Sequence, residues 1–157
     1  MRNIIISAWA RWHGAATGQS AKNYPYMQEL CDLYIKDGYH LIQVGVGNEK
    51  RLAGCEYKFD LAIPDLEKLI VNTGYFLAVD NFLHHAASVL NVPGIVIFGP
   101  SDPNLFGYKE QVNIIKDRAL LRPDQFGFYH MDYVWPNAAA GWYQPDMIYN
   151  MGKVQHV

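Results

Sequence analysis

Residues 75–102 constrain the fold most, because they predict two buried strands joined by one helix. Residues 76–79 and 95–98 are short apolar runs, which are typical of strands buried on both faces. Asn81 is a good helix N-cap, and apolar residues follow it at helical spacing: Leu83, Ala86, Ala87 and Leu90. A strand–helix–strand unit builds a parallel sheet, and ligands bind beyond the carboxyl ends of such strands.

Similar patterns on both sides of this unit predict an α/β fold. Strands are expected over residues 3–8, 39–44 and 112–115, with a weaker one over 58–62. Helices are expected from Pro25 to a glycine cap at Gly38, and over residues 50–54, 64–72 and 146–151. Residues 104–109 are expected to form a loop.

Composition narrows the class of protein and of partner. The 157 residues suffice for one domain with a full core, and the net charge of −2 argues against a nucleic-acid partner. Two unclustered cysteines, Cys31 and Cys55, favour a reducing, cytoplasmic compartment. The apolar run over residues 1–6 is too short for a signal peptide, and no run is long enough for a membrane span.

The periodic pattern ends near residue 116, and an aromatic-rich segment follows. We expect residues 1–116 to form the ligand-binding domain and residues 117–157 an irregular extension packed on it or on a partner. The extension is too aromatic for a disordered tail. Its aromatic residues are Phe126, Phe128, Tyr129, Tyr133, Trp135, Trp142 and Tyr143.

Two loops that follow predicted strands are candidate ligand loops. Residues 9–23 are rich in glycine and polar side chains, Lys22 among them; the alternative is a plain surface connection. Residues 45–49 (GVGNE) lack the third glycine of a dinucleotide fingerprint. They predict a turn that brings Glu49 to a ligand, although Glu49 as a solvated carboxylate fits equally well.

Five short motifs occur in order along the chain: KNYP at 22–25, GVGNE at 45–49, DNFLHHAA at 80–87, NVP at 91–93 and FGPSDP at 98–103. Together they resemble the carboxyl-terminal half of the heptosyltransferases of lipopolysaccharide synthesis, glycosyltransferase family 9, which have the GT-B fold. That family reads D-T-G-x-x-H-x-A-A, then G-V-P, then F-G-P-T-D-P. The resemblance implies a Rossmann-like, three-layer α/β/α domain with a mainly parallel sheet.

The resemblance also implies a ligand, a nucleotide-diphosphate sugar, with no other cofactor and no metal. In the family, the matched lysine and the amides at the helix start hold the diphosphate, which carries over to Lys22 and Asn81, and His85 on the first turn can donate to a phosphate oxygen. The match of Glu49 contacts the nucleoside sugar, and that of Asp80 the donor sugar. The candidate ligand-binding residues are therefore Lys22, Glu49, Asp80, Asn81, His85, Ser101 and Asp102.

Each candidate also has a plain structural interpretation. Asp80 can act as a capping residue only, and Ser101 and Asp102 can serve only to shape their turn. His85 can be a packed histidine, whereas His84 is expected at the surface. Adjacent histidines on a helix are expected to point in different directions and therefore not to share a metal ion.

Two departures from the family pattern bear on function. Phe82 replaces a glycine, so its ring either blocks the phosphate position or stacks on a base. The second departure is that the match covers only one half of a GT-B enzyme, and the proposed catalytic base of the family lies in the other half. No catalytic residue is therefore assigned.

Three functions stay open. The first is the donor-binding subunit of a two-part glycosyltransferase, active in hexosyl or heptosyl transfer when a separate acceptor-binding subunit is present. The second is a stand-alone protein, expected as a homo-oligomer, that binds or sequesters a nucleotide or nucleotide sugar. The third is a degenerate, non-catalytic structural domain.

Overall fold

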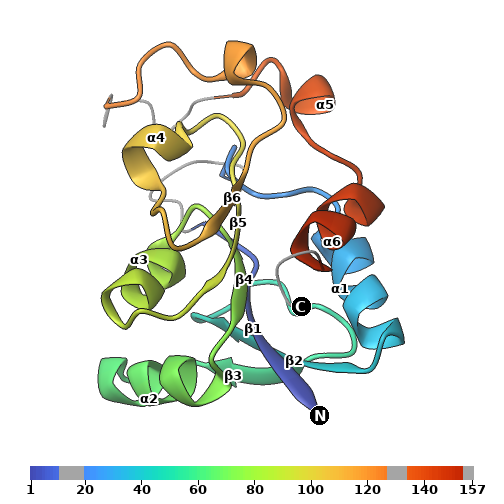
Figure 1. The fold of residues 1–157 in the computed structure, drawn as a ribbon, viewed down its shortest axis with the longest axis vertical. Helices are drawn as coiled ribbons and strands as arrows, with labels where there is room; N and C mark the ends of the chain where they lie inside the picture. Colours follow the sequence, from blue (N-terminus) through green and yellow to red (C-terminus); the bar gives the residue numbers. More distant parts are fainter. Residues whose placement is uncertain (11–19, 127–133, 154–157) are drawn as a thin grey trace.

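The computed structural model describes residues 1–10, 20–126 and 134–153, and it shows one sheet with helices on both faces (Figure 1). Among the described residues the sheet has six strands in the order β3-β2-β1-β4-β5-β6, and each neighbouring pair is parallel. The strands are β1 (Arg2–Ser7), β2 (Tyr39–Gly45), β3 (Glu56–Phe59), β4 (Phe76–Val79), β5 (Gly94–Ile97) and β6 (Val112–Ile114). The helices are α1 (Met27–Lys36), α2 (Ile63–Thr73), α3 (Phe82–Val89), α4 (Pro103–Phe106), α5 (Ala138–Gly141) and α6 (Pro145–Lys153), with a 3₁₀ turn at Arg118–Leu120.

Alternating residues of the central strands face two separate cores. Ile4 and Ile6 of β1 pack in the cluster that includes residues of α1 and α6, whereas Ile5 packs in the cluster with α2 and α3. Because neighbouring residues of a strand point to opposite faces, one apolar strand can serve both layers. The predicted Rossmann-like α/β/α architecture is therefore confirmed.

The strand order places a crevice beside β1. This strand pairs with β2 on one side, where Ile5 lies opposite Ile42, and with β4 on the other, where Ile6 lies opposite Leu77. The order 3-2-1-4-5-6 reverses direction at β1, so the chain leaves the ends of β1 and β4 toward opposite faces. Ligands of such sheets bind at this switch point.

The predicted helix over residues 50–54 is wrong. The side chain of Gln43, which is fully buried, donates to the Lys50 carbonyl at 2.9 Å and accepts from the Leu52 amide at 2.7 Å. The Ala53 amide donates to Gln28 Oε1 at 2.8 Å. Since the side chains of Gln43 and Gln28, both outside this segment, already satisfy its backbone, a one-turn helix would add little stability there.

Two further boundaries differ from the sequence prediction. The predicted loop over residues 104–109 contains α4, because Asp102 Oδ1 accepts from the Asn104 amide at 2.9 Å and Pro103 occupies the first turn. The weak strand predicted over residues 58–62 lies at Glu56–Phe59. Asp60 ends it with a φ of 56°, in the left-handed region.

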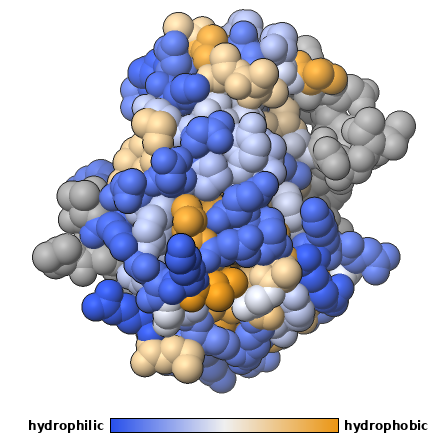
Figure 2. Space-filling model, turned by 90° about the vertical axis from the view of Figure 1, so that its right-hand side faces the viewer, coloured by the Kyte–Doolittle hydropathy of each residue, from blue (hydrophilic) through white to orange (hydrophobic). Residues whose placement is uncertain are grey.

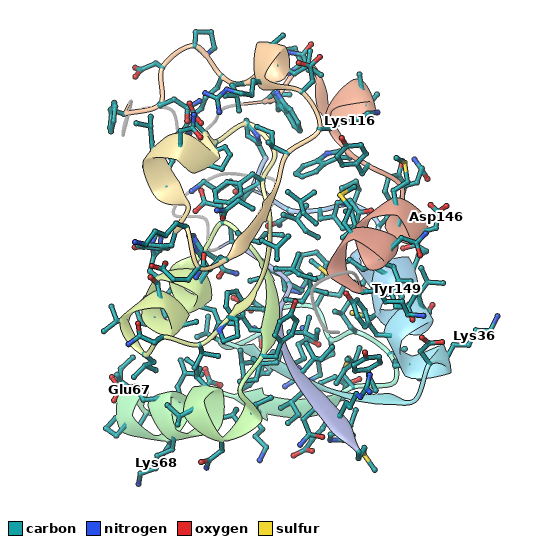
Figure 3. All side chains as sticks on the ribbon, in the orientation of Figure 1. Lys36, Glu67, Lys68, Lys116, Asp146 and Tyr149 are labelled. Carbon is teal, nitrogen blue, oxygen red and sulfur yellow. The ribbon has the colours of Figure 1, made fainter. Side chains whose placement is uncertain are left out.

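The aromatic-rich segment contributes to the same core as β1 and β5. Trp135, Trp142, Ile148 and Tyr149 are all buried in the cluster that contains Ile4 and Ile95. Helix α6 lies along α1, and Figure 3 shows Tyr149 pointing from α6 toward α1. The Tyr149 ring meets the Tyr34 ring edge-on, with 4.9 Å between the ring centroids. Phe128, Tyr129 and Tyr133 lie outside the described residues.

The molecular surface on the side of α1 and α6 is mostly hydrophilic, with a few small apolar areas (Figure 2). The apolar side chains of α6 are therefore mainly turned inward: Ile148 is 0% exposed and Tyr149 is 8% exposed. Among the described residues, no helix combines the length and the apolar character needed to cross a bilayer.

Candidate functional site

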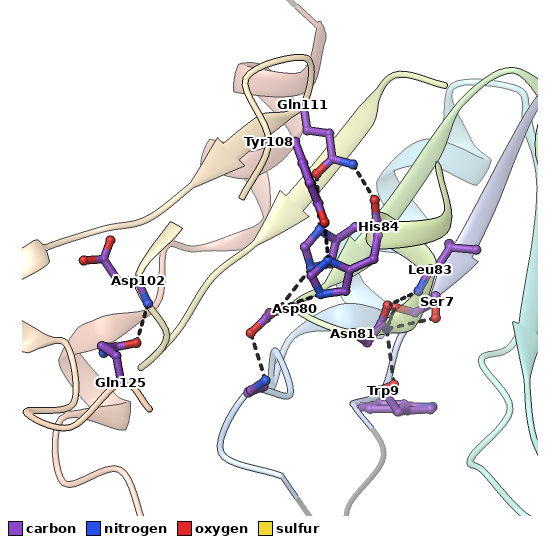
Figure 4. A network of polar contacts seen from close by, with 12 residues as sticks. Ser7, Trp9, Asp80, Asn81, Leu83, His84, Asp102, Tyr108, Gln111 and Gln125 are labelled. Carbon is purple, nitrogen blue, oxygen red and sulfur yellow. Dashed lines mark hydrogen bonds and ion pairs between the residues drawn. The ribbon is translucent and has the colours of Figure 1, made fainter. Parts of the chain in front are cut away.

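The start of α3 is tied to the end of β1 by one side chain. Asn81 Oδ1 accepts from the Leu83 amide at 3.0 Å, which confirms the predicted N-cap. Its amide nitrogen also donates to the Ser7 carbonyl at 3.1 Å and the Ser7 hydroxyl at 2.9 Å, and lies 3.3 Å from the Trp9 carbonyl. Asn81 thus fixes the free amides of α3 beside the switch point (Figure 4).

A buried carboxylate lies directly before this cap. Asp80 is 3% exposed, and its Oδ2 lies 2.9 Å from Lys22 Nζ while its Oδ1 lies 2.9 Å from His84 Nε2. Burial by itself raises the pKa of Asp80, but the hydrogen bond from His84 and the Lys22 ammonium outweigh it and lower the pKa to about 2. Asp80 is therefore an anion held between two nitrogen donors.

His84 was expected at the surface, and this prediction is wrong: the residue is 0% exposed. It lies four residues after Asp80, which places its ring over the carboxylate. Its Nδ1 lies 3.3 Å from Gln111 Oε1, and the Gln111 amide nitrogen donates to the His84 carbonyl at 2.6 Å, which fixes the orientation of that amide. Both ring nitrogens then face acceptor oxygens, so both contacts are hydrogen bonds only when the ring carries two protons.

His85 lies next to His84, on the solvent-exposed side of the cluster around Asp80. Its side chain is 42% exposed, its Nδ1 lies 2.8 Å from the Tyr108 hydroxyl and its Nε2 lies 4.0 Å from Asp80 Oδ1. The His84 and His85 ring centroids are 3.9 Å apart, so the expectation that the two rings diverge is wrong. Partial burial and the neighbouring His84 lower the pKa of His85.

A cavity of about 370 Å³ opens beside the start of α3. It is lined at the carboxyl ends of β1, β2, β3 and β4, and Glu49 is among the lining residues. Phe82 also lines it and is 60% exposed, and Trp9 belongs to the same wall, with its indole nitrogen donating to the Lys50 carbonyl at 2.8 Å. The cavity is therefore mainly apolar and aromatic, with a carboxylate at its wall.

Asp102 lies apart from this cluster (Figure 4), and Ser101 directly precedes it in the chain. Asp102 forms two hydrogen bonds of 2.8 Å with Arg118 and caps α4. The Arg118 hydrogen bonds lower the pKa of Asp102. Ser101 is fully buried after β5. The partners of Asp102 are Arg118, Gln125 and the Asn104 amide rather than Lys22 or Asp80, and these bonds are those of a turn-shaping residue.

The structure thus brings together Lys22, Asp80, Asn81 and His85, with Glu49 in the adjoining cavity wall. Sequence reasoning missed several contributors to the site: Ser7, His84, Tyr108 and Gln111. Trp9 lies in the candidate ligand loop but was not singled out. The spacing of Asp80 and His84 was a usable signal for His84. The contact of Gln111 with α3 spans 27 residues and has no local signature. Residues 11–19 of the candidate ligand loop lie outside the described residues.

No protein-family model matches the chain, and no curated protein sequence matches it either. Solved structures do match. The glycosyl transferase of family 9 from Veillonella parvula is 14% identical over 97% of this chain, with a TM-score of 0.66. The dodecameric iron-containing heptosyltransferase TibC in complex with ADP-D-β-D-heptose is 14% identical over 98% of this chain, with a TM-score of 0.64. The E. coli heptosyltransferase WaaC with ADP is 19% identical over 71% of this chain, with a TM-score of 0.57.

These matches cover only part of the longer proteins. The chain spans 45% of the Veillonella parvula protein, 42% of TibC and 37% of WaaC. Sequence identities of 14–19% support a similarity of fold alone. The chain has the fold of heptosyltransferases and other glycosyltransferases of family 9.

Proposed function

We propose that the chain binds a nucleotide-diphosphate sugar at the carboxyl edge of β1 and β4. The diphosphate lies at the amino end of α3, within reach of Lys22 and His85, and the nucleoside occupies the cavity beside Glu49. The observation that carries this proposal is that Lys22 and His85 meet around Asp80, directly before the capped start of α3, whose residues Asn81 and Phe82 line that cavity.

The charges at this corner support an anionic ligand. The first amides of α3 have no partners within the helix, and the helix dipole adds a partial positive charge there. The Lys22 ammonium has three donors, and the contact with Asp80 engages only one side of it. His85 is partly exposed and can turn a ring nitrogen toward a phosphate oxygen.

The aromatic walls support the placement of the base. Phe82 does not fill the start of α3, since its ring is 60% exposed and lines the cavity. A base stacked on such a ring gains about 1–3 kcal/mol in nucleic-acid-binding proteins. Two of the similar proteins were solved with ADP or with ADP-D-β-D-heptose, which makes an adenine nucleotide the first ligand to test.

The wider role that we propose is the donor-binding part of a glycosyltransferase. The chain spans less than half of each similar protein. We propose that it acts together with an acceptor-binding subunit or with a second copy of this chain. Native mass measurements of the chain alone and with that subunit distinguish these two assemblies.

Titration calorimetry with ADP, UDP, GDP and their sugar conjugates tests the proposal. Lys22→Ala and His85→Ala should each weaken binding by about tenfold or more, because each removes a charged or polar partner of the phosphates. Lys68→Ala is the matched control: this lysine lies on the outer side of α2 (Figure 3), and its removal should leave the affinity unchanged. Unchanged affinity in both site variants, or no binding of any nucleotide by the native chain, would overturn the proposal.

A further inference from the structure

Three potential metal ligands meet beside the proposed phosphate position. Asp80, His84 and His85 each offer one donor atom, and these atoms all lie within 4.8 Å of one another. Among the described residues, no second group of three such side chains occurs. We propose that these three side chains bind one divalent transition-metal ion, with Zn²⁺ the ion that fits them best.

The donor set selects the class of metal. Two imidazole nitrogens and one carboxylate oxygen are the mixed ligands that Zn²⁺ and its first-row neighbours prefer, whereas Mg²⁺ and Ca²⁺ prefer oxygen alone. Three protein ligands also leave a coordination position open. That position faces the mouth of the site, because His85 is 42% exposed while Asp80 is nearly buried.

The distances are close to those that the ion requires. A tetrahedral ion with bonds of 2.0–2.1 Å holds its donors about 3.3 Å apart. Asp80 Oδ1 lies 2.9 Å from His84 Nε2 and 4.0 Å from His85 Nε2, so these two pairs lie on either side of the required value. His85 needs to turn inward while Asp80 and His84 separate slightly, and His85 is the partly exposed member of the group.

Further contacts orient both rings for this role. The orientation of the Gln111 amide makes its Oε1 the acceptor for His84 Nδ1, which directs Nε2 toward Asp80. The Tyr108 hydroxyl lies 2.8 Å from His85 Nδ1, which likewise leaves Nε2 of that ring for the ion. Hydrogen bonds from the far nitrogen of a metal-bound histidine are the usual way in which proteins orient it.

The carboxylate can serve Lys22 and the ion at once. Lys22 contacts Oδ2, while Oδ1 faces the two histidines and is the oxygen proposed to bind the ion. The ion takes the place of the proton that joins His84 Nε2 to Oδ1. The buried carboxylate therefore stays neutralised on both oxygens, as a buried anion must be.

The test uses the untagged full chain, stripped of metal by a chelator and free of nucleotide. Zn²⁺ is titrated by calorimetry, and Co²⁺ is added as a spectroscopic probe whose visible absorption reports nitrogen and oxygen ligands. We expect one tightly bound ion per chain, and about tenfold or more weaker binding in His85→Ala. His40→Ala is the matched control. His40 also faces a carboxylate, with Nε2 2.7 Å from Glu56 Oε2, but among the described residues the two do not form part of a group of three potential metal ligands.

A second variant separates ligation from folding. Tyr108→Phe keeps the ring that packs against His85, with centroids 5.6 Å apart, and removes only the hydroxyl. Loss of such an outer contact should weaken Zn²⁺ binding by about 10–100-fold. Unfolding curves of the metal-free variants, which should stay close to that of the native chain, establish that both are folded.

The inference is overturned if the native chain binds no Zn²⁺, or if His85→Ala and His40→Ala bind it equally well. Because no nucleotide is present, the outcome is separate from that of the nucleotide titration. The native chain could bind Zn²⁺ through His85 and yet bind none of the nucleotides tested. That result would support the metal site and reject the proposed function. Nucleotide binding in a chain that binds no Zn²⁺ would support the proposed function and reject the metal site.

Discussion

At the scale of single residues, Asn81 does more than cap a helix. Its Oδ1 caps α3, and its amide nitrogen reaches Ser7 and Trp9 at the end of β1. The first contact is local and was predicted from the sequence. The second spans 74 residues to Ser7 and follows from the pairing of β1 with β4. Asn81 therefore determines how close the two sides of the proposed phosphate site lie.

The two roles of Asn81 can be separated by substitution. Serine is as good an N-cap as asparagine, so Asn81→Ser keeps the cap and loses only the contacts with β1. We expect it to lower the free energy of unfolding by about 1–2 kcal/mol, because the part-buried carbonyl of Ser7 loses a donor. Asn81→Ala should lose about 1 kcal/mol more, since the cap is removed as well. Urea unfolding curves measure both, and a neutral Asn81→Ser would show that the contacts with β1 contribute nothing.

At the scale of elements, α6 is held on α1 by packing and by one charged network. Asp37, at the end of α1, accepts from the Tyr149 hydroxyl and lies 2.6 Å from Lys153 Nζ. The Lys153 and Tyr149 hydrogen bonds lower the pKa of Asp37. This carboxylate therefore stabilises the native state above its unfolded pKa, and that stabilisation is lost as the pH falls through the lowered value.

This network predicts a pH-dependent effect of Asp37→Asn. At pH 7 the variant should unfold at a lower urea concentration than the native chain, because the ion pair is absent. The two midpoints should approach each other as the pH falls through the lowered pKa of Asp37, since the native carboxyl then becomes protonated too. Glu67→Gln, on the outer side of α2 (Figure 3), removes an exposed carboxylate and should show neither effect. A gap between Asp37→Asn and the native chain that does not narrow as the pH is lowered would contradict the prediction.

At the scale of the whole molecule, the segment after residue 116 completes one of the two cores. Trp135 and Trp142 meet edge-on with 5.1 Å between ring centroids, and the Trp142 ring lies against Gly99 at the end of β5. Ile148 belongs to the same cluster. The division into residues 1–116 and 117–157 stays a prediction. These contacts indicate that residues 1–116 alone would lack part of one core.

A chain truncated after residue 116 tests that division directly. Exposing side chains such as Trp142, Ile148 and Tyr149 costs about 1.5–3 kcal/mol for each one, which together approaches the whole stability of a typical domain. We expect residues 1–116 to lack a cooperative thermal transition by circular dichroism and to aggregate on gel filtration. Residues 1–153 serve as the control. A cooperative transition of residues 1–116 would instead establish them as an independent domain.

The sequence by itself determined the elements and their class. Apolar runs such as residues 76–79, helical spacing after Asn81 and the glycine at Gly38 are local signals, and the structure has the strand, the helix and a positive φ there. The ordered motifs also indicated the family whose fold the chain has. Local propensity and burial pattern suffice for such features, because they depend on neighbours a few residues apart.

Only the tertiary structure decided the arrangement of the site. Gln43 replaces a predicted turn of helix over residues 50–54, and the buried Asp80 draws His84 inward, although that histidine was expected in solvent. Tyr108 and Gln111 reach α3 across 23 and 27 residues. Contacts of this length arise from strand order, which brings the ends of distant segments to one edge of the sheet, and no local pattern in the sequence encodes them.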